Sequence, residues 1–350
     1  MIEGFRVLDA DAHVIEPAHV FRDWQPPGTM PIDLPPDTPM VPCGDIELLR
    51  DQFDHGFDAP SYLRAMDAQG IDAVVLYPSI GLFVPYLPHL LPSESANACA
   101  SYNEWVADYC TTDPQRMAAV GLVPLADVEL AVSAARHAAT LGLVGVLARP
   151  NHVYGRNLGD PAYDPLWHVC VELGLVVSVH EGLGLRGATI GADRFDGFAA
   201  RHALSHPMEQ MAAMTSLVLD GALERHEQLR VAFLESATGW LPYWLHRLDE
   251  HREWMQPGRV PASELFGRQC VISTEVEDDC LAATIARVGA DHVLWASDFP
   301  HPDARFPDAG VTFLRTCSGQ NIALRDITDM LWAAPISFYL LADRFTAAAP

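Results

Sequence analysis

The chain contains no lysine, because all 22 of its Lys and Arg residues are arginine. A Schiff-base lysine, a pyridoxal-phosphate enzyme and a Walker-type phosphate loop each need a lysine, so these three classes are excluded. The residue types left for chemistry are the carboxylates, the 15 histidines and any metal ion that they bind. The composition therefore favours acid–base or metal-dependent catalysis.

Positive charge is scarce as well, and the formal net charge is -24 at pH 7. Nucleic-acid binding and polybasic membrane anchoring both depend on a basic surface, so neither is expected. The apolar runs are far shorter than the ~20 residues of a membrane-spanning helix. Residues 1–6 lack the basic and apolar regions of a signal peptide. We expect a cytoplasmic protein whose partners are a small-molecule substrate and further copies of itself, as a homodimer or higher homo-oligomer.

The seven cysteines are odd in number, scattered, and never arranged as Cys-x-x-Cys. A disulfide framework or a zinc ribbon is therefore not expected. Most of the cysteines lie in apolar segments, which is typical of small buried side chains.

Short runs rich in Val, Ile and Leu alternate with longer helical patterns, and several helical patterns end at a glycine directly before the next run. This is typical of a helix C-cap that leads into a buried parallel strand. Eight strands are predicted, at 5–11, 71–77, 117–122, 143–148, 175–180, 229–235, 271–274 and 293–298. Helices are predicted at 61–69, 93–110, 128–141, 161–173, 207–226 and 278–288. Eight β/α units, with no Gly-x-Gly-x-x-Gly after the first strand, favour a (β/α)₈ TIM barrel over an open doubly wound sheet.

We expect residues 1–350 to form one barrel domain with two long loop insertions. Residues 14–60 follow the first predicted strand, and residues 181–205 follow the fifth. Both segments leave the carboxyl end of a strand, where barrel active sites are built, so they are candidates for lids or pocket walls.

Ligand-type side chains stand at the carboxyl ends of several predicted strands. Asp11 and His13 occupy alternate positions, which point to the same side of a strand, while His180 and Asp298 end the fifth and eighth strands. Taken singly, His180 is compatible with a core histidine and Asp298 with a helix N-cap. Together, two carboxylates and two imidazoles on one barrel rim suit one divalent cation, with zinc preferred and manganese or magnesium as alternatives.

Four further residues are candidates for catalysis or substrate binding. Glu235 ends the sixth strand and suits a catalytic base, or it pairs with an arginine or caps a helix. His206 either reaches the pocket or is a turn residue, and His301 either donates to the substrate or supports a metal ligand. Arg149, at the end of the fourth strand, is the best-placed cation for a substrate carboxylate, with a structural ion pair as the alternative.

Four motifs carry a resemblance to a known family: Asp-x-Asp-x-His at 9–13, Val-His-Glu-Gly at 179–182, the segment 229–250, and Trp-Ala-Ser-Asp-Phe-Pro-His at 295–301. Together they resemble the amidohydrolase-2 branch of the amidohydrolase superfamily over nearly the whole chain. The resemblance implies a metal-dependent barrel enzyme with Asp11, His13, His180 and Asp298 at the ligand positions, although the family more often has His or Glu at the first. Binuclear members of the superfamily bridge two metals with a carboxylated lysine, so one metal is expected here.

The resemblance leaves the reaction open. Its decarboxylases have a histidine where this chain has Glu235, and a glutamate repels a substrate carboxylate unless it is protonated. We therefore expect hydrolysis of a small cyclic or aromatic, carboxylated compound by a metal-activated water, with Asp298 and Glu235 taking the proton. The alternatives are a non-oxidative decarboxylase or a hydratase of the same substrate class, and a non-catalytic binding barrel.

Overall fold

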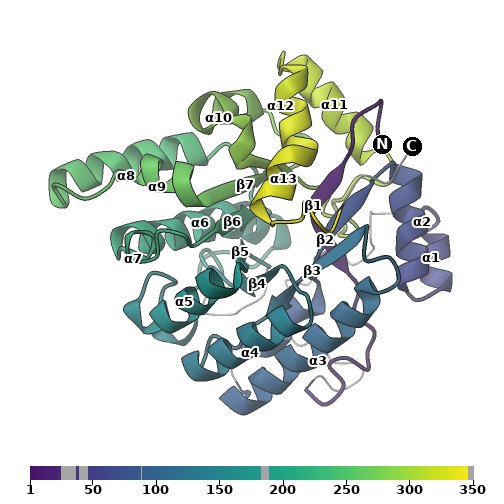
Figure 1. The fold of residues 1–350 in the computed structure, drawn as a ribbon, viewed down its shortest axis with the longest axis horizontal. Helices are drawn as coiled ribbons and strands as arrows, with labels where there is room; N and C mark the ends of the chain where they lie inside the picture. Colours follow the sequence, from purple (N-terminus) through teal and green to yellow (C-terminus); the bar gives the residue numbers. More distant parts are fainter. Residues whose placement is uncertain (25–36, 39–45, 88, 183–188, 346–350) are drawn as a thin grey trace.

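The computed structural model describes residues 1–24, 37–38, 46–87, 89–182 and 189–345. Eight parallel strands form one sheet in chain order, and the helices surround them (Figure 1). The strands are β1 (Leu8–Val14), β2 (Ala73–Pro78), β3 (Met117–Leu122), β4 (Gly145–Ala148), β5 (Val176–His180), β6 (Val231–Leu234), β7 (Cys270–Thr274) and β8 (Val293–Trp295). Every strand is buried along its full length, as expected of a parallel sheet covered by helices. The predicted (β/α)₈ barrel is confirmed.

The helices lie between and after the strands. They are α1 (Arg50–Asp54), α2 (Ala59–Gln69), α3 (Pro92–Cys110), α4 (Val128–Thr140), α5 (Asp164–Leu173), α6 (Phe198–Leu219), α7 (Ala222–Arg225), α8 (Leu241–Met255), α9 (Ala262–Gln269), α10 (Leu281–Val288), α11 (Ala309–Gly319), α12 (Leu324–Thr328) and α13 (Ala334–Phe338). Short helical turns occur at Ile80–Leu82, Val84–Tyr86, Val153–Gly155, Pro161–Tyr163, Ala290–His292 and Asp329–Ala333.

Helix α2 shows how the sequence specifies these boundaries. The Asp58 side chain accepts a hydrogen bond from the backbone N–H of Ser61, which caps the first turn. Gly70 ends the helix in the left-handed conformation with φ of 73°, which costs glycine little. Strand β2 begins three residues later, so the predicted helix–glycine–strand pattern is confirmed here.

The helix after β5 begins earlier than the sequence indicated. A start at 207 was predicted because proline favours the first helical turn, but α6 begins at Phe198 and carries Pro207 inside it. The predicted insertion 181–205 therefore contains helical residues from 198 onward, while 183–188 lie outside the described residues. So do 25–36 and 39–45 of the insertion 14–60. His202 and His206 consequently lie one helical turn apart on the same face of α6.

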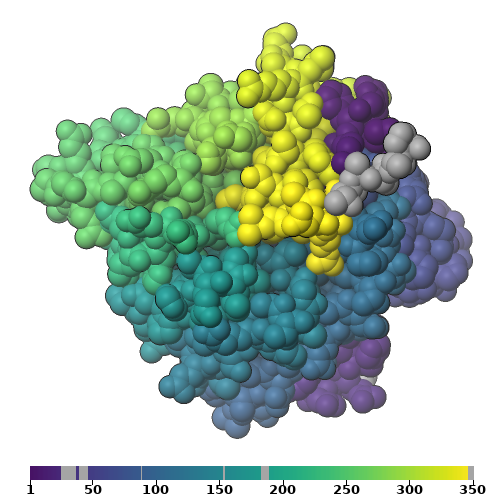
Figure 2. Space-filling model, in the orientation of Figure 1, coloured from purple at the N-terminus to yellow at the C-terminus, as the bar shows by residue number. Residues whose placement is uncertain are grey.

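The C-terminal part of the chain lies over the middle of one face of the molecule (Figure 2, yellow). Its Tyr339 is buried, and the phenol oxygen lies 2.6 Å from that of Tyr77. The Tyr77 phenol oxygen in turn lies 3.0 Å from the hydroxyl oxygen of Ser178 on β5. These hydroxyls satisfy one another's hydrogen bonds inside the barrel, and the Tyr77 ring lies beside the His180 ring, with centroids 5.7 Å apart.

The composition predicted neither a membrane-spanning helix nor a disulfide framework. No helix among them combines the length and apolar character needed to cross a membrane. Six of the seven cysteines are described, and all six are free thiols, as expected.

A buried side-chain hydrogen-bond pair attaches α3 to the end of β3. Asn103 donates to the carbonyl of Leu122 at 3.0 Å and accepts from its N–H at 2.6 Å. Asn103→Ala leaves both backbone groups without these partners and is expected to lower the free energy of unfolding by about 2 kcal/mol. Asn97→Ala, at an exposed position of the same helix, is the matched control and should stay within ~0.5 kcal/mol of wild type. Urea denaturation compares them, and equal values for the two variants would show that the Leu122 contacts contribute little.

Candidate metal and catalytic site

The site is built where the segment after β8 meets β1. The backbone N–H of Asp298 donates to the carbonyl of Asp11 at 3.1 Å, and the N–H of His13 donates to the carbonyl of Phe299 at 2.7 Å. Buried Asp9 reinforces this junction, because its carboxylate accepts from the N–H of Ser297 at 3.0 Å and from the Ser297 hydroxyl. Burial raises the pKa of Asp9 to about 7 despite these hydrogen bonds. The junction brings Asp11 and His13 next to Asp298.

Four ligand-type side-chain atoms converge here: Asp11 Oδ1, His13 Nε2, His180 Nε2 and Asp298 Oδ1. The first three are buried and have no hydrogen-bond partner. Asp11 Oδ1 lies 3.4 Å from His180 Nε2 and 3.7 Å from His13 Nε2, which lies 3.2 Å from Asp298 Oδ1. Metal–ligand bonds of ~2.0–2.2 Å in tetrahedral geometry place neighbouring ligand atoms roughly 3.4 Å apart. Asp11 Oδ1, His13 Nε2 and His180 Nε2 therefore fit a single divalent cation in spacing and in chemistry, and Asp298 Oδ1 lies beside His13 as the candidate fourth ligand.

Hydrogen bonds on the opposite ring nitrogens orient both imidazoles. His13 Nδ1 donates to the carbonyl of Pro78 at 2.8 Å, and His180 Nδ1 donates to the carbonyl of Glu181. With the proton on Nδ1, the Nε2 lone pair of each ring points into the cluster, which is the tautomer that binds a metal.

His301 lies beside the cluster and contacts Asp298. Its Nδ1 lies 2.8 Å from Asp298 Oδ1, its Nε2 lies 3.2 Å from the Ser79 hydroxyl, and its ring stacks on His13 at a centroid distance of 3.9 Å. Although burial favours the neutral ring, the carboxylates of Asp298 and Glu235 raise the pKa of His301 to about 10. His301 and His13 in turn lower the pKa of Asp298 well below its ordinary range, against the effect of burial. Without a metal, the pair is an imidazolium–carboxylate pair.

Glu235 follows β6 with a left-handed backbone φ of 49°. Such a conformation is unfavourable for a residue with a Cβ. It breaks the regular alternation of side-chain directions at the end of the strand. Glu235 Oε2 lies 3.3 Å from His180 Nδ1, and Oε1 lies 3.5 Å from His206 Nε2. Burial and the Asp298 carboxylate raise the pKa of Glu235 well above its ordinary value, in spite of His180 and His301.

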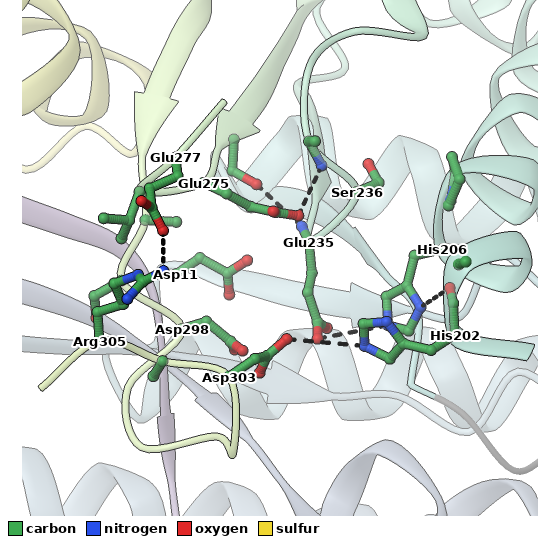
Figure 3. Close-up of a pocket in the computed structure, with 18 residues that line it drawn as sticks. Asp11, His202, His206, Glu235, Ser236, Glu275, Glu277, Asp298, Asp303 and Arg305 are labelled. Carbon is green, nitrogen blue, oxygen red and sulfur yellow. Dashed lines mark hydrogen bonds and ion pairs between the residues drawn. The ribbon is translucent and has the colours of Figure 1, made fainter. Parts of the chain in front are cut away.

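A cavity of about 470 Å³ opens beside these residues (Figure 3). Its described lining includes six carboxylates, from Asp11, Glu235, Glu275, Glu277, Asp298 and Asp303. Arg305 is the arginine among the described lining residues, and it already pairs with Glu277. The pocket is therefore strongly acidic, so an anionic substrate requires cations to enter it.

Arg149 lies outside this set of lining residues and is fully buried. Its Nε donates to Asn151 Oδ1 at 2.9 Å, one terminal nitrogen donates to the carbonyl of Gly182, and the same nitrogen lies 3.5 Å from Glu181 Oε1. These contacts fasten the end of β4 to the segment after β5. They agree with a structural ion pair, and binding of a substrate carboxylate by Arg149 stays a prediction.

The other predicted site residues come together. Asp11, His13 and His180 place their ligand atoms within 4.8 Å of one another, and His13 also groups with Asp298 and His301. Sequence reasoning missed His202, Asp303 and Glu275, which line the same cavity. The His-x-x-x-His spacing of 202 and 206 was the available signal for one of them, and it was hidden because the helix was expected to begin after both.

A family model described as Amidohydrolase, the amidohydrolase-2 family, matches residues 8–339. The chain therefore belongs to this family, as the sequence motifs indicated.

Two decarboxylases and an amidohydrolase are among the proteins similar to this chain. The 2-amino-3-carboxymuconate-6-semialdehyde decarboxylase of Dictyostelium discoideum is 25% identical over 218 residues, which are 60% of this chain and 58% of that protein. An amidohydrolase from Mycobacterium avium subsp. paratuberculosis K-10 superposes with a TM-score of 0.78 at 21% identity, covering 96% of this chain and 99% of that one. A dihydroxybenzoic acid decarboxylase from Polaromonas sp. JS666, with bound manganese and 2-nitroresorcinol, superposes with a TM-score of 0.73 at 19% identity, covering 98% and 100%. At these identities the two structures show a shared fold.

The burial of Arg149 leads to a prediction that separates its two roles. Arg149→Met leaves the Glu181 carboxylate buried without its cation, so the free energy of unfolding should fall by about 3 kcal/mol. The double variant Arg149→Met/Glu181→Gln should recover part of that loss, because the uncompensated charge is gone. Thermal and urea unfolding give both values. An Arg149→Met protein of wild-type stability that no longer binds carboxylated ligands would instead favour substrate recognition.

Proposed function

We propose that this protein is a metal-dependent, non-oxidative decarboxylase of a small aromatic or similarly unsaturated carboxylic acid. The observation that carries the proposal is the convergence of Asp11 Oδ1, His13 Nε2 and His180 Nε2, which are buried and have no hydrogen-bond partner, next to the Asp298 carboxylate. The decarboxylase relatives, one of which was solved with manganese, support both the metal and the reaction. Zinc and manganese both suit the two-imidazole, two-carboxylate set.

A cation held by these four residues would supply Lewis-acid stabilisation of the substrate's carboxylate and a neighbouring oxygen. The residues of the chain orient the metal ligands and form the substrate pocket. Pro78 and Glu181 hold the two imidazoles in the required tautomer through their carbonyl oxygens. A cavity of about 470 Å³ accommodates a molecule with one ring.

The Asp298–His301 pair is the proton source in this proposal. As the bond between the substrate carbon and its carboxylate breaks, carbon dioxide leaves and the electron pair remains on the carbon. The proton held between His301 Nδ1 and Asp298 Oδ1, which lie 2.8 Å apart, forms the new C–H bond, and a solvent proton restores the pair. Ser79 keeps the ring oriented through its contact with Nε2.

The environment of Glu235 favours decarboxylation over the hydrolysis expected from the sequence. Where no cation is bound, burial raises the pKa of Glu235, so its carboxyl already holds a proton and cannot take one from water. A cation bound by Glu235 would replace that proton and would equally remove the charge that repels a substrate carboxylate. Hydrolysis and hydration remain the alternative outcomes of the assays below. The single-domain organisation, the homodimer and the preference for zinc stay predictions.

A panel of hydroxybenzoates and unsaturated carboxylic acids, with esters and lactones of matched size, tests the proposal. Incubation in D₂O should release carbon dioxide and place one deuterium at the vacated carbon. A sample stripped of metal by a chelator should be inactive and regain activity with Mn²⁺ or Zn²⁺. A product that carries ¹⁸O from H₂¹⁸O, with no carbon dioxide released, would contradict decarboxylation and support hydrolysis.

Two isosteric variants assign the proton transfer. His301→Gln should lower kcat by about 10²–10⁴-fold, the usual contribution of a general acid, while the bound metal is retained. Glu235→Gln keeps a neutral side chain of the same shape and should keep kcat within about tenfold of wild type. Steady-state kinetics and elemental analysis of both proteins provide the comparison. Loss of activity in Glu235→Gln with His301→Gln still active would reverse the two roles and favour a glutamate base.

A further inference from the structure

A second group of ligand-type side chains lies in the same cavity, further from the β1–β8 junction. His202 and His206 come from α6, Glu235 follows β6, and Asp303 lies in the segment after β8. Figure 3 shows the two imidazoles side by side, facing the carboxylates of Glu235 and Asp303. None of these four residues was expected to bind a metal.

The geometry points to a second divalent-cation site formed by His202, His206, Glu235 and Asp303. Ligand atoms of His202, His206 and Glu235 all lie within 4.8 Å of one another. Asp303 Oδ2 lies next to this group, 3.9 Å from His202 Nε2. The set offers two imidazole nitrogens and two carboxylate oxygens, which is the same donor composition as the first site.

The histidine spacing is that of a helical chelate. Positions i and i+4 share one face of a helix, and the rings of His202 and His206 lie with centroids 4.4 Å apart. His206 Nδ1 lies 3.1 Å from the Ser205 hydroxyl and 3.3 Å from the carbonyl of His202. A proton on Nδ1 satisfies these contacts and leaves Nε2, which faces Glu235 Oε1 at 3.5 Å, free to bind a cation.

Glu235 lies between the two sites. One of its carboxylate oxygens is 3.3 Å from the first-site residue His180, and the other is 3.5 Å from His206. The expectation of a single metal rested on the absence of a lysine to bridge two ions. The second site needs no bridge, because Glu235 faces His180 on its Nδ1 side, away from the Nε2 of the first site.

The charge of the cavity favours a second cation. Six carboxylates line it, and Arg305 is already paired with Glu277, so one divalent ion leaves a surplus of negative charge. That negative charge repels a substrate carboxylate unless a second cation offsets it. The second site should be the weaker one, because His202 is 34% exposed and Asp303 is 63% exposed, whereas the first-site side chains of Asp11, His13 and His180 are almost fully buried.

Equilibrium dialysis of the metal-free, full-length protein against Zn²⁺, with metal and protein both quantified, tests this inference. Wild type should bind two equivalents, one tightly and one more weakly. His202→Gln should bind one. Asp303→Asn, at an exposed position where misfolding is not a concern, should retain the tight equivalent and weaken the second at least tenfold. Asp11→Asn should lose the tight equivalent and keep the weaker one.

His246→Gln is the matched control, because His246 is 68% exposed and forms an i, i+4 pair with Glu250 on α8. It should still bind two equivalents. One equivalent in wild type, two in His202→Gln, or the same loss in His246→Gln as in His202→Gln would overturn the inference. These measurements report metal binding and do not depend on activity. A wild-type protein that binds one equivalent and still releases carbon dioxide would contradict the second site but would leave the proposed function intact.

Discussion

The closure of the barrel between β8 and β1 is the constraint on which the site depends. Two backbone hydrogen bonds join the segment after β8 to β1, and the Asp9 carboxylate holds Ser297 against the same strand. This closure brings the carboxylates of Asp11 and Asp298 close to two buried imidazoles. Like charges that are buried close together are costly, so the arrangement calls for positive charge at its centre.

The same constraint explains the electrostatics around the cluster. Where no metal is present, protons on the imidazoles provide the balancing charge. Burial lowers the pKa of His180, but the carboxylates of Asp11 and Glu235 raise it to about 9, and those near His301 raise its pKa to about 10. A cation can replace these protons, which is how metal sites built from histidine and carboxylate ordinarily form. Carboxylates beyond the cluster extend the negative charge toward the mouth of the cavity and make the entry of an anionic substrate dependent on bound cations.

The sequence predicted the barrel and the principal cluster because both follow from local patterns. Eight buried strands appear as runs of β-branched residues, and the alternation from Asp9 to His13 places ligand-type side chains on one side of β1. That reasoning succeeded even though the register with β2 shifts between Asp9 and Ala12, an irregularity that no local pattern reveals.

Other features depend on contacts between distant segments and could not be predicted in this way. Arg149 looked available to a substrate, but its partners come from Asn151 and the segment after β5, including Glu181. Helix α8 was not predicted, because it is highly charged and lacks a terminal glycine, and it projects to the left in Figure 1. Pro207 suggested a helix start where the chain is already helical, and this concealed the pairing of His202 with His206.

The central claim is that the four donor atoms at the β1–β8 junction hold one divalent cation. The most direct test is a crystal structure of the protein with one equivalent of Zn²⁺, with diffraction data collected at the zinc absorption edge. One strong anomalous peak is expected within bonding distance of Asp11 Oδ1, His13 Nε2, His180 Nε2 and Asp298 Oδ1. A junction without such a peak, with zinc bound only elsewhere on the protein, would contradict it.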